Sequence, residues 1–254
     1  MKFSLNLNKI ALLRNARGEN NPSLEDYAHK AIDLGVDGLT LHPRPDHRHA
    51  TSNDVISLGR ICKDRDVEFN IEGNPFSEPS EPFKGYVNLV DICQPDQATL
   101  VPDLPNQITS DHGWESGDHD DGLINVIANI NILCKKTSIS LFVDNLKNQN
   151  TNLDSIDYAL KVKANTIEIH TGEFSKQIDN HDFAINDHLK ELIYKAKDKN
   201  LLVNAGHDLN LINLPHLAKI GGVNEVSIGH AIVVDALNYG FEDTIKRYIE
   251  VIKG

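Results

Sequence analysis

The stretch Asp37-Gly38-Leu39-Thr40-Leu41-His42-Pro43-Arg44-Pro45-Asp46-His47-Arg48-His49 joins a short apolar run to a strongly polar segment. Each proline disfavours helical backbone in the residue before it, so we expect His42 and Arg44 to be extended. Alternate residues of an extended chain face the same way, so both side chains can project toward one cleft. The stretch therefore predicts an α/β protein in which functional residues follow the carboxyl end of a strand.

Strand-like runs of this kind alternate with helical patterns along the chain. The predicted strands lie at 3–7, 38–41, 67–71, 87–93, 138–143, 166–170, 201–204 and 225–228. The predicted helices lie at 24–34, with Ser23 as N-cap and Gly35 as its end, at 53–63, 123–134, 153–162 and 186–197, and from His230 onward. Eight strand and helix units in about 250 residues predict a (β/α)8 barrel, and the absence of a linker favours one domain over residues 1–254.

The segment 95–122 is the longest stretch without a predicted element. Loops of this length are usually functional lids or disordered, so we expect a covering loop. Its Asp, Glu and His content suggests a metal site, but the spacing lacks an apolar framework and a solvated loop is the better interpretation.

Composition narrows the classes of function. The formal charge of -12 makes nucleic acid and anionic membranes unfavourable partners, although a local Arg and His cluster can still bind an anionic substrate. The three cysteines form no CxxC pair, which fits a reducing cytoplasm and argues against a cysteine zinc site. No run approaches the roughly 20 apolar residues of a membrane span.

Polar or ionisable residues occur at the ends of nearly all the predicted strands. These are Asn6, Asn8, His42, Arg44, Glu72, Asp144, Glu168, His170, His207 and His230. In a parallel barrel the carboxyl ends of all strands open on one face, so we expect these groups to converge. Any one of them is more often structural than catalytic, but together they favour an enzyme.

Two places suit phosphate. Gly229 and His230 stand where the last strand passes into a helix, whose free N-H groups and dipole attract anions, although Gly229 could equally serve only a tight turn. Arg14, Arg17 and Gly18 follow the first strand, and arginine forks match phosphate oxygens.

Five segments together resemble the pyridoxine 5'-phosphate synthase family. They are the run from Asn6 to Gly18, Leu41-His42-Pro43-Arg44 with His49, Ile167-Glu168-Ile169-His170-Thr171-Gly172, Val203-Asn204-Ala205-Gly206-His207, and Ile228-Gly229-His230-Ala231-Ile232. The resemblance implies a barrel with extra helices that condenses 3-amino-2-oxopropyl phosphate with 1-deoxy-D-xylulose 5-phosphate. It also implies no metal or organic cofactor, and a homo-oligomer, an octamer in this family.

The resemblance further implies roles for single residues. His42 and Glu72 would be proton acceptors, His207 the proton donor, and Glu168 the group that stabilises charge in the transition state. The aminoketone phosphate would meet Asn6, Arg17, Asp208, Gly229 and His230. The pentulose phosphate would meet Asn8, Lys9, Arg44, His49 and Thr109.

The chain departs from the commoner family pattern at two places. Asn8 and Lys9 stand where Asp and His are usual, so an amide and an ammonium replace a carboxylate and an imidazole at the contacts to the pentulose hydroxyls. Asp208 stands where Gly is usual, and we expect its carboxylate to point away from phosphate.

Two other functions compete with this interpretation. One is a sugar-phosphate aldolase or isomerase that uses a lysine Schiff base, for which only Lys9 is a candidate. The other is a barrel that binds a phosphorylated metabolite without catalysis. A metal-dependent hydrolase is disfavoured because no HxH or HExxH motif occurs on an expected strand or helix.

Overall fold

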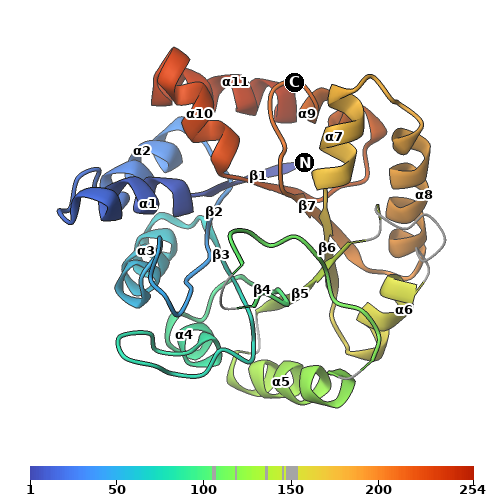
Figure 1. Cartoon of the computed structure of the whole chain (residues 1–254), viewed down its shortest axis with the longest axis horizontal. Coiled ribbons are helices and arrows are strands. Elements are labelled where there is room, and N and C mark those ends of the chain that lie inside the picture. Colours follow the sequence, from blue (N-terminus) through green and yellow to red (C-terminus); the bar gives the residue numbers. More distant parts are fainter. Residues whose placement is uncertain (105–106, 118, 135–136, 145, 147–153) are drawn as a thin grey trace.

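Eight parallel strands close into a barrel at the centre of the molecule, with helices around it (Figure 1). The computed structural model describes residues 1–104, 107–117, 119–134, 137–144, 146 and 154–254. The strands are Lys2–Asn6 (β1), Gly38–Leu41 (β2), Glu68–Gly73 (β3), Gln97–Leu100 (β4), Ser138–Val143 (β5), Thr166–His170 (β6), Leu202–Gly206 (β7) and Glu225–Ile228 (β8). Each strand pairs with the next, and β8 pairs with β1, which closes the ring. The predicted (β/α)8 barrel is confirmed.

The helices lie on the outside of the barrel (Figure 1). They are Asn8–Arg17 (α1), Leu24–Leu34 (α2), Ser52–Arg65 (α3), Tyr86–Cys93 (α4), Asp120–Leu133 (α5), Asp154–Lys161 (α6), Gly172–Asp179 (α7), Ile185–Asp198 (α8), Leu214–Ile220 (α9), His230–Tyr239 (α10) and Phe241–Lys253 (α11). Two helices follow each of β1, β6 and β8, so the predicted extra helices are present. No described helix is long and apolar enough to cross a membrane.

The prediction of a strand at 87–93 was wrong. This segment is α4, whose buried residues Tyr86, Leu89 and Val90 follow helical spacing, and the fourth strand is β4. β4 escaped notice because it has only four residues and half of them are polar. The predicted loop at 95–122 is therefore wrong at both ends, since it contains β4 and the start of α5.

Other boundaries agree more closely with the prediction. Ser23 caps α2 by accepting a hydrogen bond from the Asp26 N-H, and Gly35 ends that helix with a φ of 98°, as predicted. Residue 153, the first of the predicted helix at 153–162, lies outside the described residues, and the rest of that helix is α6. Helices α1, α7 and α9 were not predicted.

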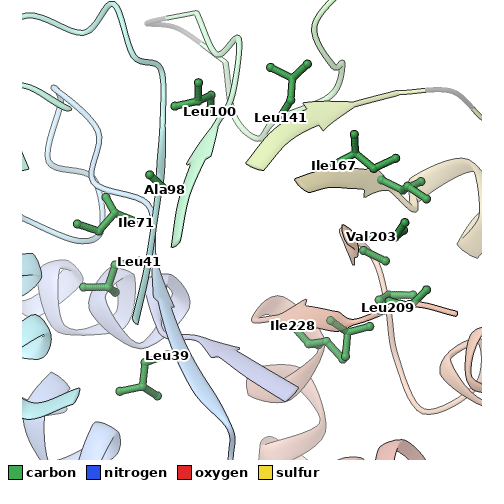
Figure 2. Close-up of a cluster of buried hydrophobic side chains, with 14 of the residues drawn as sticks. Leu39, Leu41, Ile71, Ala98, Leu100, Leu141, Ile167, Val203, Leu209 and Ile228 are labelled. Carbon is green, nitrogen blue, oxygen red and sulfur yellow. The ribbon is translucent and has the colours of Figure 1, made fainter. Parts of the chain in front are cut away.

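Apolar side chains fill the space between the strands and the helices. Figure 2 shows members of this layer, such as Leu39 and Leu41 on β2 and Ile71 on β3, all of them buried. The polar residues that alternate with these apolar residues along the strands form hydrogen bonds with one another. The Ser4 and Thr40 hydroxyls lie 2.7 Å apart, and the Thr99 hydroxyl donates to Asn70 at 3.1 Å. Because a strand alternates its faces, the apolar core surrounds a barrel whose lining is polar.

Candidate active site

A cavity of about 660 Å³ opens where the carboxyl ends of the strands meet. Its lining includes Asn6, Asn8, Lys9, His42, Arg44, His49, Glu72, Thr109, Glu168, His207, Asp208, Gly229 and His230. These are all the residues to which the family resemblance gives a role, except Arg17. Asp144 and His170, which were also expected among the converging groups, are not part of this lining. Arg17 is exposed at the C-terminal end of α1 and does not line the cavity of the single chain, and its contact with substrate stays a prediction.

His42 lies between two carboxylates. Its Nδ1 is 3.6 Å from Glu72 Oε2, and its Nε2 is 3.2 Å from Asp103 Oδ2. Burial alone would lower the pKa of His42, but hydrogen bonding to Asp103 and Glu72 outweighs burial and raises the pKa. The imidazole is thus held as a cation more readily than a free histidine.

Arg44 and His49 line the cavity next to His42. Arg44 makes an ion pair with Asp103, yet within the described residues its buried Nε has no hydrogen-bond partner, and neither has the buried Nδ1 of His49. Burial and the nearby charges of His42 and Arg44 lower the pKa of His49 to about 2, so its ring is neutral at pH 7. Buried donors without partners are suited to a polar ligand.

The loop that carries these residues is fastened by α1. Asn15 Nδ2 donates to the carbonyls of His47, Arg48 and His49, at 3.2, 3.2 and 2.7 Å. Arg14 binds both Asn15 and Asp54, and Asp54 also completes the capping box of α3 with Thr51. Hydrogen bonds from α1 therefore hold the polar loop that follows β2 in place.

Asn6 and Asn8 connect β1 to this wall. The Asn6 amide donates to Glu72 Oε2 at 3.3 Å and accepts from the Asn8 N-H at 3.0 Å. Asn8 Oδ1 accepts a hydrogen bond from the backbone N-H of His42 at 3.0 Å, so the Asn8 side chain holds the backbone of His42 in place.

Glu168 occupies the interior of the barrel below the cavity mouth. It accepts a hydrogen bond from Thr99 at 3.4 Å, and a Cβ on Gly206 would lie only 2.5 Å from its Oε1. Burial and the carboxylates of Glu72 and Glu225 raise the pKa of Glu168 well above its usual value. Its surroundings therefore favour the neutral acid more than water does, and glycine at position 206 gives the side chain room.

His207 has very different surroundings from His42. Its ring centroid is 4.7 Å from that of His170 and 5.4 Å from that of Phe142. Burial and the neighbouring His170 lower its pKa to about 3. His207 is therefore a neutral imidazole near pH 7.

The start of α10 supplies backbone N-H groups to the opposite wall. Gly229 precedes this helix, and a Cβ there would lie 2.8 Å from the Asn6 carbonyl oxygen, so only glycine allows this close approach. Asp208 has a φ of 56°, and its Oδ2 lies 3.2 Å from the place of a Cβ on Gly172. Its carboxylate thus lies toward the start of α7.

Asp103 was not predicted as a site residue. It is 7% exposed and contacts both His42 and Arg44. The signal was present, because Asp103 follows β4 by three residues, but the misplaced fourth strand assigned it to a solvated loop. Among the described residues no cluster of three or more His, Cys, Asp or Glu side chains is arranged to hold a metal ion.

The fold and the cavity together define a (β/α)8 barrel of the kind that handles small molecules at the carboxyl ends of its strands. Solved barrels share the fold at low identity. A thiamine phosphate pyrophosphorylase from Pyrococcus furiosus matches with a TM-score of 0.60 and 13% identity, over 99% of this chain and 95% of its own. An N-(5'-phosphoribosyl)anthranilate isomerase from Pyrococcus furiosus matches with a TM-score of 0.60 and 10% identity, over 100% and 98%.

Sequence comparison identifies the family. Residues 3–254 match the model described as pyridoxal phosphate biosynthesis protein PdxJ. The pyridoxine 5'-phosphate synthase of Cytophaga hutchinsonii is 41% identical, over 99% of both chains, and that of Xanthomonas oryzae pv. oryzae is 38% identical, over 100% of this chain and 97% of its own. The chain belongs to the pyridoxine 5'-phosphate synthase family of enzymes.

Proposed function

We propose that this enzyme condenses 3-amino-2-oxopropyl phosphate with 1-deoxy-D-xylulose 5-phosphate to form pyridoxine 5'-phosphate, inorganic phosphate and water. The observation that carries the proposal is the full-length match to this family, combined with a cavity that gathers all but one of the residues to which the family resemblance gives a role. One barrel over residues 1–254 would perform the reaction, and the proposal invokes no metal or organic cofactor.

The pentulose phosphate would bind against Arg44 and His49. Arg44 Nε and His49 Nδ1 are buried and without a partner in the described part of the chain, so a phosphate would satisfy both. Thr109 lies in the segment after β4 and lines the cavity, which supports a covering role for that segment over the bound sugar. Asn8 and Lys9 would face the sugar hydroxyls.

The aminoketone phosphate would bind at the start of α10. The N-H groups of Gly229 and His230 and the helix dipole favour an anion there, and Asn6 lies against Gly229. Asp208 would contribute through its backbone N-H, because its carboxylate lies toward Gly172.

The ring closure needs repeated proton transfers, which imidazole and carboxyl groups would perform. His42 Nδ1 and Glu72 would take protons from the condensing substrates. His207 would return a proton to a leaving oxygen after gaining one, since an approaching phosphate raises the proton affinity of a nearby imidazole. Glu168 would stabilise the positive charge of an iminium intermediate when its own proton departs.

The direct test supplies both phosphorylated substrates to the purified protein and measures pyridoxine 5'-phosphate and inorganic phosphate. We expect equal amounts of the two products. Each substrate alone is the control and should release none. Folded protein that binds both substrates but makes no pyridoxine 5'-phosphate would overturn the proposal.

Assembly and location extend the proposal. We propose a cytoplasmic homo-oligomer, an octamer in line with the family resemblance. The large apolar side chains exposed on α1 and α10, among them Leu13 and Leu237, support burial against another subunit, and three free cysteines suit a reducing compartment. Sedimentation analysis would give the mass of the assembly.

A further inference from the structure

Asp103 is a buried carboxylate that none of the proposed roles uses. It follows β4 on the sequence Val101-Pro102-Asp103, and its backbone carbonyl is held by the Asn74 side chain at 2.8 Å. Its carboxylate contacts two groups with separate tasks, the proposed proton acceptor His42 and the proposed phosphate ligand Arg44.

The two nitrogens of His42 face different cavities. Glu72, which lies near Nδ1, lines the large cavity, whereas Asp103, which lies near Nε2, lines a smaller cavity of about 250 Å³. His42 and Arg44 line both, so their side chains form the wall between the two spaces. Asp103 therefore approaches His42 from behind, on the side away from the substrates.

A carboxylate in this place selects the tautomer of a neutral imidazole. Asp103 is the nearer of the two carboxylates, 3.2 Å from Nε2 against 3.6 Å between Glu72 and Nδ1. When Asp103 accepts the Nε2 proton, the lone pair of His42 lies on Nδ1 and faces the large cavity. A neutral partner at residue 103 could not hold the proton on Nε2 in the same way. His42 would then present either tautomer to the substrates.

The same carboxylate competes with a phosphate for Arg44. Asp103 pairs with this guanidinium, and burial of both groups keeps the pair out of water. A phosphate that arrives at Arg44 meets a negative charge beside its binding site. The smaller cavity behind the wall gives the Asp103 side chain space to move as Arg44 turns toward the phosphate.

We infer that Asp103 is a positioning residue that orients His42 as a proton acceptor and restrains Arg44 until the pentulose phosphate arrives. The inference rests on the proposed function for the identity of the two groups. It assigns Asp103 opposite effects on the two steps, because it assists proton transfer and opposes phosphate binding.

The charged and titratable groups around His42 come from four sides. Glu72 lies on β3, Asp103 follows β4, Arg44 and His49 follow β2, and His207 follows β7. Of these, Asp103 and Glu72 are the anions, so replacing Asp103 by a neutral residue leaves Glu72 as the single carboxylate beside the ring.

The variant Asp103→Asn keeps the shape and removes the charge. We expect kcat to fall by about 100-fold or more, in line with general base catalysis. We expect the affinity for inorganic phosphate and for 1-deoxy-D-xylulose 5-phosphate, measured by calorimetry, to stay level or to improve by up to about tenfold, because a like charge has gone. Nitrogen NMR of labelled histidine, recorded at a pH at which His42 is neutral, should show His42 shift from the Nε2-H tautomer toward a mixture.

Two further variants separate this role from plain support of the fold. Asp103→Glu retains the carboxylate and should recover the Nε2-H tautomer and part of kcat. Asp46→Asn is the matched control, since Asp46 pairs with Arg48 in the same loop at 2.8 Å but is exposed, and it should leave kcat and phosphate affinity unchanged.

Weaker phosphate binding in Asp103→Asn, lost in step with kcat while the His42 tautomer is unchanged, would overturn the inference. A wild-type protein that makes no product would contradict the proposed function instead. The binding and NMR measurements need no turnover, so they would still decide the part played by Asp103.

Discussion

His42 and His207 line the same cavity, but the sides of the barrel that carry them differ in charge. The His42 side, at the ends of β2, β3 and β4, places an imidazole between the carboxylates of Glu72 and Asp103. The His207 side, at the ends of β5, β6 and β7, surrounds its imidazole with aromatic rings. Carboxylates favour the cation and burial among rings favours the neutral form, so one cavity holds two histidines of opposite proton affinity.

This difference bears on the proposed catalytic roles. His42 retains a proton more readily and His207 less readily than a free histidine. A protonated His42 would have to pass its proton on before it acts as an acceptor, and Glu72 near Nδ1 is placed to receive it. We expect the proton affinities of both histidines to change when the two phosphorylated substrates bind.

The largest effect on activity is expected from removing the imidazole of His42, which lies between the carboxylates of Glu72 and Asp103. We expect His42→Ala to lower kcat by about 10²- to 10⁴-fold, the usual contribution of a general base, with the protein still folded. Steady-state assays with both substrates give the measurement. His47→Ala, in the same loop but outside the cavity lining, serves as control and should retain kcat within about twofold. Equal activity of the two variants would remove His42 from the mechanism.

A second variant, Gly206→Ala, tests whether the position of Glu168 matters for the reaction. In Gly206→Ala the new Cβ would fall 2.5 Å from Glu168 Oε1, so the acid must move. We expect kcat to fall by about 10-fold or more and the free energy of unfolding to drop by about 1–3 kcal/mol from overpacking.

Gly240→Ala is the control for Gly206→Ala. Gly240 has a φ of 77° and open space around its Cβ position, so alanine there costs about 1 kcal/mol of stability through backbone strain. It should leave kcat intact. Unchanged kcat in Gly206→Ala would mean that the position of Glu168 does not matter for the reaction.

The pH dependence of stability should have opposite signs for the two histidines. The pKa of His207 is about 3 in the fold and about 6.5 in the unfolded chain, so the unfolded chain binds the proton first as pH falls. Stability should drop between pH 6.5 and 3, by up to about 1.4 kcal/mol per pH unit from this group. The raised pKa of His42 gives stability that is complete below about pH 6.5 and is lost as pH rises through the folded value.

Urea unfolding of the wild type, His207→Asn and His42→Asn across this pH range separates the two. His207→Asn should flatten the acid slope, and His42→Asn should flatten the slope on the alkaline side. Parallel curves for all three proteins would show that neither histidine changes its proton affinity on folding.

A smaller effect is expected from Asn15, whose side chain holds the backbone of the loop that carries His49. Asn15→Ala removes the hydrogen bonds to the carbonyls of residues 47–49, so His49 loses its fixed place. We expect KM for the pentulose phosphate to rise by a few fold, about 1 kcal/mol, with kcat little changed. Asn88→Ala, which removes a side-chain hydrogen bond on the exposed face of α4, is the control. A kcat effect without a KM effect would contradict the anchoring role.

The sequence predicted the barrel because its strands are short runs bounded by turn residues, and it predicted the cavity because polar groups end those runs. It misplaced the fourth strand because β4 has only four residues, and two of them, Gln97 and Thr99, are polar. That single error also hid Asp103. The charge states of His42 and His207 depend on residues from other strands, so no local pattern could reveal them.

Alternation along the strands has a practical consequence for protein engineering. Leu39, Leu41 and Ile71 hold the helices from the outer surface, whereas Thr40 and Asn70 hydrogen-bond inside the ring. The two sets share strands but not contacts. A library that varies only the inner positions could therefore equip this scaffold for new chemistry while its packing, and with it most of its resistance to heat, stays as it is.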